Sequence, residues 1–231
     1  MNDEVYTLHR GSTPLLVSLP HVGREIPAEL QPRYVIDLNR PPENTPMYPG
    51  VNNTELCPTR FFTGEPLVRD GQAPDTAEVA QRVERWWRPY HAALRAELTR
   101  LRALHGHAVL FDGHSIRSEL PWLFDGRLPD LNLGTADGAS CAPSLRDALA
   151  AVLAAQSRWT QVVDGRFKGG HITRHYGRPD EGVHAVQLEM CWRCYMVEAP
   201  PHAWDAARAA AVQPLLRRLV ETMRDWRPDA A

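Results

Sequence analysis

Two apolar runs of the sequence lead directly into side chains that can do chemistry, where a buried strand would normally end in a turn. Residues 107–111 are followed by Asp112 and His114, and residues 14–19 are followed by His21. Because strand side chains alternate between faces, Asp112 and His114 should lie on the same face. A catalytic zinc ion typically takes three histidine or carboxylate ligands and keeps one position for water. A zinc site is therefore one hypothesis, and a structural role for each histidine is the other.

Glu189 is the third candidate, because it interrupts an otherwise apolar run between Val183 and Met190. Burial among Leu188 and Met190 should raise the pKa of this carboxyl, which suits a group that accepts a proton from water. A glutamate can take the proton of a water molecule that attacks a carbonyl carbon beside a metal. The alternative is a glutamate at the strand end that forms a structural salt bridge.

The elements around these residues predict an α/β fold with a mixed central sheet flanked by helices, in one domain over residues 1–231. We expect strands at 14–19, 34–38, 107–111 and 183–190, and helices at about 75–105, 144–156 and 201–226. Strands that alternate with helices are typical of this class, and its ligands bind beyond the carboxyl ends of the strands. Residues 41–75 and 121–142 are expected to be long loops.

The composition excludes several classes of partner. The chain has 231 residues, 43% of them hydrophobic, with 26 basic and 28 acidic residues and a net charge of -2. This balance gives no reason to expect nucleic acid or an anionic membrane as a partner. No apolar stretch approaches the length of a membrane span, and the N-terminus is acidic and polar, so we expect a cytoplasmic protein. The four cysteines are too few and too unevenly spaced for a disulfide framework.

Six motifs in order, from about residue 5 to residue 198, resemble the N-formylglutamate amidohydrolases, also called N-formylglutamate deformylases. They are SLPHVG, RYVIDLNRP, YPGVNNTELCP, FDGHSIRS, KGGHITRHYGRP and VQLEMCWRCYM. The resemblance implies a fold similar to zinc carboxypeptidases and aspartoacylases. It also implies hydrolysis of N-formyl-L-glutamate to L-glutamate and formate, the last step of one bacterial route of histidine degradation.

The resemblance implies roles for individual residues. His21 and His114 match the zinc-binding histidines of the family, and Glu189 matches the position expected for the general base. Asp112 is expected to approach the metal or the substrate. His171 is expected either to polarise the formyl oxygen or to cap its loop.

The substrate carries two carboxylates, and a guanidinium group binds a carboxylate through two parallel hydrogen bonds. Arg40, Arg174 and Arg178 are the arginines that we expect to bind it, and a solvated surface charge is the alternative for each. Weaker candidates for orienting the substrate are Asn39, Asn53, Thr54 and His175.

The chain departs from the family between the first two expected strands. Members have a helical segment there with an Asp-x-Asp-like motif, and the resemblance implies that one of its carboxylates completes the zinc site. Here residues 23–32 run straight to Arg33, and a parallel crossover normally needs about a dozen residues or more. Either the enzyme is naturally impaired, or the recorded gene is incomplete, or another carboxylate substitutes. The candidates for substitution are Glu25, Glu29, Asp37 and Asp112.

We favour weakened metal binding among these interpretations, and we expect the lost helix to leave apolar surface exposed. A protein that binds acylated or free glutamate without turnover is then the main alternative to an enzyme. Cys191 and Cys194 form a Cys-x-x-Cys motif, so a redox protein is a further alternative. A hydrolase with Cys57 or Cys191 as the nucleophile is the last.

Overall fold

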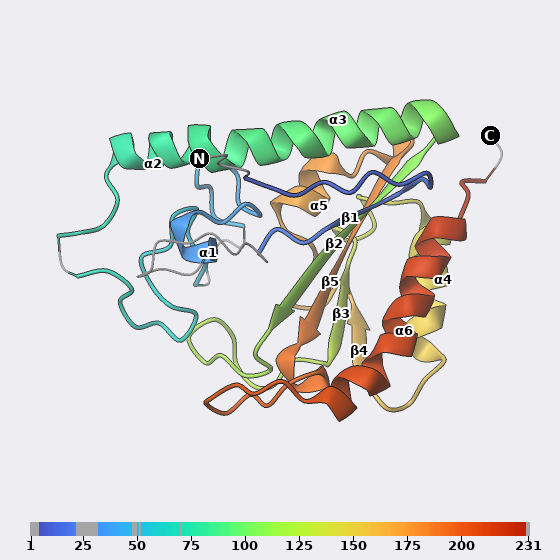
Figure 1. Ribbon diagram of the computed structural model, residues 1–231. Helices are drawn as coiled ribbons and strands as arrows, with labels where there is room; N and C mark the ends of the chain where they lie inside the picture. Colours follow the sequence, from blue (N-terminus) through green and yellow to red (C-terminus); the bar gives the residue numbers. More distant parts are fainter. Residues whose placement is uncertain (1–4, 22–31, 48–49, 51, 70, 230–231) are drawn as a thin grey trace.

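A five-stranded mixed sheet forms the centre of the protein in the computed structural model, which describes residues 5–21, 32–47, 50, 52–69 and 71–229 (Figure 1). Its strands are β1 Leu15–Ser18, β2 Ala108–Ile116, β3 Leu131–Gly134, β4 Gln161–Val163 and β5 Val183–Cys191. The strand order is β1-β2-β5-β3-β4. β1, β2 and β5 run parallel, whereas β3 runs antiparallel to β5 and β4 runs parallel to β3. The predicted mixed sheet is therefore confirmed.

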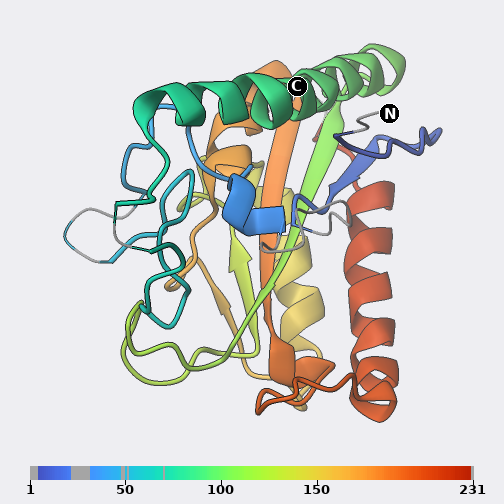
Figure 2. The ribbon, with the colours of Figure 1, turned by 60° about the vertical axis from the view of Figure 1, so that its left-hand side comes forward.

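The helices lie on both faces of this sheet. They are α1 Pro32–Val35, α2 Thr76–Arg82, α3 Arg88–His105, α4 Pro143–Ala154, α5 His171–Tyr176 and α6 Ala206–Asp225. A π-helical turn, Val83–Trp87, joins α2 to α3, so the two form one long rod (Figure 1). α4 and α6 pack side by side at the other face (Figures 1 and 2). No helix in the described part of the chain is long and apolar enough to cross a membrane.

The rod of α2 and α3 begins and ends where the sequence predicts. The Asp75 side chain accepts a hydrogen bond from the Glu78 amide and caps the first turn. Gly106 ends α3 in the left-handed conformation, with φ of 76°. Between these ends, Leu94 and Leu98 pack against the sheet face that carries Leu110.

α4 and α6 cover the opposite face of the sheet with a largely apolar core. Val109 and Phe111 of β2 and Val186 and Leu188 of β5 point to this side. The helices contribute buried leucines and a methionine to the same cluster: Leu145, Leu149, Leu153, Leu215, Leu219 and Met223. Successive residues of β2 and β5 therefore alternate between two different environments.

One predicted strand is absent, and two short strands were not expected. Residues 34–38, expected to be a strand, instead complete α1 and continue into a turn, and Ile36 packs with Leu56 and Trp87 outside the sheet. β3 and β4 lie in segments where no strand was expected. They have only four and three residues, and a pattern that short does not distinguish a strand from a buried loop.

The expected long loop is present between α1 and α2. Its described residues contain no helix or strand, only an isolated bridge between Arg60 and Pro66. The loop lies beside the carboxyl ends of the central strands (Figure 2). At the edge of the sheet formed by β1, the residue Val17 is 45% exposed and Leu19, just after the strand, is 51% exposed. Apolar surface is thus exposed next to β1.

Candidate active site

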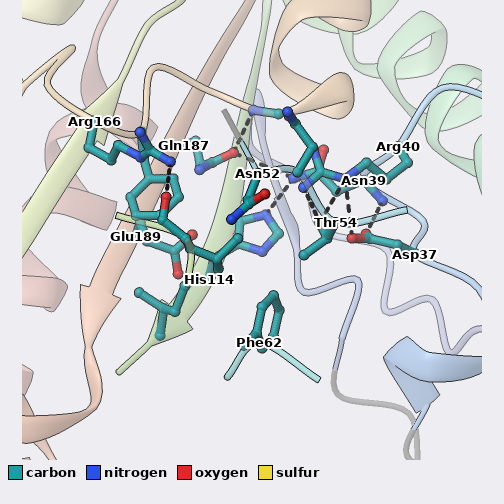
Figure 3. Close-up of a pocket in the computed structure, with 15 residues that line it drawn as sticks. Asp37, Asn39, Arg40, Asn52, Thr54, Phe62, His114, Arg166, Gln187 and Glu189 are labelled. Carbon is teal, nitrogen blue, oxygen red and sulfur yellow. Dashed lines mark hydrogen bonds and ion pairs between the residues drawn. The ribbon is translucent and has the colours of Figure 1, made fainter. Parts of the chain in front are cut away.

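A cavity lies at the carboxyl ends of β2 and β5, on the face covered by α3 and α5. The strands supply His114, Gln187 and Glu189, and the long loop supplies Asp37, Asn39, Arg40 and residues 52–54. Its volume, with open solvent included, is about 630 Å³. Figure 3 shows these side chains converging from the strands and the loop.

His21 and His114 face each other at this edge of the sheet. Their Nδ1 atoms are 3.2 Å apart. The outer nitrogens each meet a fully buried carboxylate: His21 Nε2 lies 2.9 Å from Asp37 Oδ1, and His114 Nε2 lies 2.7 Å from Asp112 Oδ2. Because a carboxylate can only accept, a proton on each Nε2 would pair with the carboxylate behind it and would leave both Nδ1 lone pairs available for a metal ion.

This arrangement fits two ligands of one zinc ion. Two nitrogens that each lie about 2.0–2.1 Å from zinc are about 3.3 Å apart in a tetrahedral site. Histidine ligands also donate their second N–H to a carboxylate, which fixes the tautomer and the orientation of the ring. Asp37 and Asp112 are the carboxylates that lie beside the second ring nitrogen of His21 and of His114.

The third ligand is not provided by the described residues. Among residues 5–229, excluding the gaps at 22–31, 48–49, 51 and 70, no group of three or more His, Cys, Asp or Glu forms a metal site. Asp37 and Asp112, two of the predicted substitutes, bind the outer nitrogens of the histidines instead. The other two substitutes, Glu25 and Glu29, lie outside the described residues.

Asp112 is held in place by a chain of buried hydroxyl groups. The Ser18 hydroxyl donates to Asp112 Oδ1 at 3.2 Å. The Tyr90 hydroxyl lies 2.6 Å from Ser18 Oγ, and it donates because the Ser18 proton is already used. Burial, followed by the charge of Asp112, raises the pKa of Tyr90, so this phenol stays protonated. The chain therefore connects α3, β1 and β2 to the ring of His114.

Asn39 lines the cavity and connects the loop to α5. Its Oδ1 accepts from the Ile172 amide at 2.8 Å, and its Nδ2 donates to Asp112 Oδ2 at 3.2 Å. A Cβ atom at Gly170 would lie only 2.3 Å from Asn39 Nδ2. Gly170 is thus required for this close approach. Asn39, predicted to orient the substrate, is buried, and its side chain forms these hydrogen bonds with other residues of the protein.

Glu189 lies beside His114 in the sheet and lines the same cavity. The two residues are register partners in the parallel pair β2 and β5, on the same face. The Glu189 residue is 8% exposed. On its other side, Asn132 of β3 donates to the Glu189 carbonyl at 3.2 Å. The Glu189 side chain therefore lines the cavity beside His114.

Two arginines line the cavity from opposite ends, Arg40 and Arg166 (Figure 3). Arg40 Nε donates to Thr54 Oγ1 at 3.1 Å and lies 3.6 Å from Asp37 Oδ2. Arg166 donates through Nη2 to the Leu123 carbonyl. The sequence reasoning selected Arg40 and missed Arg166, which precedes the Lys-Gly-Gly motif and carries no local signal of its own.

Arg174 and Arg178 lie outside the cavity lining. Both are exposed, and both bond to nearby backbone: Arg174 Nε donates to the Gly169 carbonyl at 2.8 Å, and Arg178 Nη1 donates to the Arg174 carbonyl at 2.9 Å. Their predicted contact with the substrate is not supported by this arrangement.

His171 and His175 also lie outside the lining, in a stack of rings behind it. Their ring centroids are 5.0 Å apart, and His91 lies 5.5 Å from His171. Burial lowers the pKa of His171 to about 4 and that of His91 to about 3, so both rings are neutral. His91 lies 2.9 Å from the Leu38 carbonyl, which supports the loop that carries Asp37 and Asn39.

The cysteine alternatives lack a reactive thiol. Burial raises the pKa of Cys191 to about 12 and also raises the pKa values of Cys57 and Cys194. A thiol must ionise to act as a nucleophile or a redox group. These buried thiols therefore do not support a cysteine hydrolase or a redox protein.

Comparison with known proteins agrees with this geometry. The sequence profile of the family described as N-formylglutamate amidohydrolase matches residues 30–196. This chain belongs to that family. N-formylglutamate deformylases from Pseudomonas putida and Pseudomonas aeruginosa are each 42% identical to it over 260 residues, with 97% of both chains covered.

The fold is shared with a solved member of the family. The crystal structure of the N-formylglutamate amidohydrolase from Ralstonia eutropha JMP134 superposes with a TM-score of 0.69 at 24% identity, over 94% of this chain and 93% of that one. The alignment with the Pseudomonas relatives, at 260 residues, is longer than this chain of 231. Each relative therefore has residues with no counterpart here.

Proposed function

We propose that the chain hydrolyses N-formyl-L-glutamate to L-glutamate and formate with the help of zinc. The observation that carries the proposal is the pair of facing Nδ1 atoms of His21 and His114, each ring backed by a carboxylate and both beside Glu189. The relatives named N-formylglutamate deformylase support the same substrate.

The ligands that we assign to the zinc are His21 and His114. Bound there, a zinc ion would polarise the formyl oxygen and acidify a water molecule. Asp37 and Asp112 act one layer further out, where they orient the two rings and keep Nδ1 unprotonated. This role replaces the direct metal contact that the sequence suggests for Asp112.

Glu189 is the general base in this proposal. It accepts the proton of the water that attacks the formyl carbon, and it then returns a proton to the amine nitrogen as the C–N bond breaks. Its buried position beside His114 supports this assignment. The His171 ring lies outside the cavity lining, so we assign it to supporting the loop rather than to polarising the formyl oxygen.

Arg40 and Arg166 are the groups that we assign to the two carboxylates of the substrate. They line the cavity from opposite ends, which matches a substrate with an acidic group at each end of its chain (Figure 3). Arg40 is held by Thr54 and Asp37, and Arg166 by the Leu123 carbonyl. A guanidinium that is already oriented loses less entropy when it binds a carboxylate.

Binding without turnover is the second candidate function. It is favoured by the incomplete ligand set of the described residues and by the additional residues of the relatives. A site with two histidines alone would hold zinc weakly, although Arg40 and Arg166 would still bind the substrate. Glu189 argues for turnover, because binding a dianion does not require a buried carboxylate in the cavity.

The deciding experiment is a zinc measurement on the purified chain after dialysis against metal-free buffer, together with an assay for formate released from N-formyl-L-glutamate. About one zinc ion per chain with formate release would support the enzyme. A metal-free chain that binds N-formyl-L-glutamate without releasing formate, even when zinc is added, would support the second function. His114→Gln is the control that should lose any bound zinc.

A further inference from the structure

A second hollow in the surface is lined almost entirely by arginine. Its residues are Arg127, Arg158, Trp159, Arg193 and Arg208. It is open to solvent, and its volume is about 600 Å³ with open solvent included. It shares no lining residue with the catalytic cavity. Within the described part of the chain, no carboxylate lines it. Four cations from segments far apart in the sequence therefore surround one space.

Arg193 is rigidly positioned in this arginine hollow. It lies just after β5, and its Nη2 is 2.6 Å from Asp130 Oδ1. Asp130 is itself buried, and its Oδ2 accepts from the Thr160 amide at 2.9 Å and from the Thr160 hydroxyl at 2.7 Å. One edge of the guanidinium is thus fixed by a buried network.

The other arginines are also oriented by the protein. Arg208, in the first turn of α6, donates to the Met196 carbonyl at 3.0 Å and lies 3.1 Å from Asp205. The Arg158 guanidinium lies over the Trp159 ring, 5.1 Å from its centroid. Arg127 forms only a long contact of 3.9 Å with Glu119.

The neighbouring carboxylates leave this charge incompletely balanced. Asp130, Asp205 and Glu119 each face one arginine, and the described ion pairs include no carboxylate partner for Arg158. Each guanidinium has five N–H donors, more than these contacts use. Like charges that share a hollow repel one another, and a bound anion relieves that repulsion. Guanidinium groups bind oxyanions through paired hydrogen bonds.

We propose that the arginine hollow binds a small divalent oxyanion of the phosphate type, at a site distinct from the catalytic cavity. Four guanidinium groups exceed what one monovalent carboxylate can use, whereas a phosphate group presents several acceptor oxygens and up to two charges. Free phosphate and the phosphate group of a small monoester share this chemistry. The open rim of the hollow admits both.

The test is isothermal titration of the full chain with inorganic phosphate at constant ionic strength. We expect saturable binding to a single site, weakened at least about tenfold by Arg158→Gln, because this variant removes a charge-assisted hydrogen bond to the anion. Arg158 is chosen because its removal leaves no buried carboxylate unpaired. Arg193→Gln should weaken binding further, provided that its circular dichroism spectrum matches that of the unmodified chain.

Two control variants locate the anion. Arg217→Gln removes an exposed charge from α6 outside the hollow and should leave the affinity unchanged. Arg166→Gln changes the catalytic cavity and should also leave phosphate binding unchanged. Loss of binding with Arg166→Gln but not with Arg158→Gln would place the anion in the catalytic cavity and overturn the proposal.

The absence of saturable binding would overturn it as well. If inorganic phosphate binds, a second titration with glycerol phosphate distinguishes free phosphate from a phosphate monoester as the ligand. Tighter binding than inorganic phosphate indicates a monoester as the ligand, and equal or weaker binding indicates free phosphate. Either result supports the site if Arg158→Gln weakens it.

Discussion

The two faces of the central sheet use the same strands for different purposes. On the face covered by α4 and α6, β2 and β5 present Val109, Phe111, Val186 and Leu188 to a continuous apolar core. On the face covered by α3 and α5, the same strands begin with small and apolar residues and then change character at their carboxyl ends. There β2 presents Asp112 and His114, and β5 presents Gln187 and Glu189.

This contrast shows how the fold combines stability with a polar site. The apolar face can bury its side chains completely, so it stabilises the strands along their whole length. The other face can then place charged and polar groups at the strand ends, where buried hydrogen bonds compensate them. Mutations on the two faces should therefore separate into effects on catalysis and effects on stability.

Glu189→Gln should have the largest effect on the polar face. The amide cannot accept the proton of water, so we expect kcat to fall about 10²–10⁴-fold, the usual contribution of a general base. Zinc content should be unchanged, because the proposed ligands remain. Steady-state formate release and elemental analysis of the same preparation measure both. An unchanged rate would remove Glu189 from the mechanism.

Leu149→Ala, on the apolar face, should lower stability and leave activity unchanged. Leu149 is buried in the cluster between α4 and the sheet, so its truncation should lower the free energy of unfolding by about 2–5 kcal/mol. Activity per folded molecule should stay the same. Urea unfolding measures the loss. Leu104→Ala, at a residue that is 62% exposed, is the matched control and should change stability by less than about 0.5 kcal/mol.

Asp112→Asn tests the layer behind the metal ligands. The amide is similar in size but cannot supply the negative charge that orients His114, so zinc affinity should fall about 10–100-fold. Competition with a chromophoric chelator measures the affinity directly, without reference to activity. Asp147→Asn, an exposed carboxylate on α4, should leave it unchanged. Equal zinc affinity in Asp112→Asn would show that His114 does not depend on this partner.

Arg166→Ala and Arg174→Ala compare a residue inside the cavity with one outside it. We expect Arg166→Ala to raise KM about tenfold or more, because a charge-assisted hydrogen bond to a substrate carboxylate is lost. Arg174→Ala should leave KM nearly unchanged, contrary to the role that its motif suggests. Initial rates over a range of N-formyl-L-glutamate concentrations give both values. A raised KM in Arg174→Ala alone would restore the sequence-based assignment.

The pH dependence of stability should involve buried histidines on both faces. Burial lowers the pKa of His91, on the polar face, to about 3 and that of His184, beside Trp226 on the apolar face, to about 4. Both are neutral when folded and take up protons on unfolding. Stability is therefore fully present above the unfolded pKa of about 6.5 and is lost as the pH falls toward 4.

Each such proton adds up to about 1.4 kcal/mol per pH unit to the slope of unfolding free energy against pH. His184→Gln should make this slope shallower between pH 6 and about 4.5, as followed by urea unfolding of the zinc-free protein. His9→Gln, at an exposed position, should leave this slope unchanged. An unchanged slope in His184→Gln would contradict the neutral buried state.

Many local features of the protein were readable from the sequence alone. The helix cap at Asp75, the glycine end at Gly106 and the strand β5 depend on patterns within a few residues, and they are as predicted. β2 begins as predicted but continues to Ile116, five residues beyond the predicted end at Phe111. The polar strand ends of β2 and β5 were visible for the same reason. The six motifs also identified the family correctly.

Only the tertiary structure decided how residues distant in the chain meet. It brought Asp37 to His21 and Asn39 to Gly170, and it placed Arg166 in the cavity while leaving Arg174 outside it. It also turned residues 34–38 away from the sheet, because Ile36 found its apolar partners in Leu56 and Trp87. Such outcomes depend on packing between separate segments, and no spacing along the chain encodes which segments will come into contact.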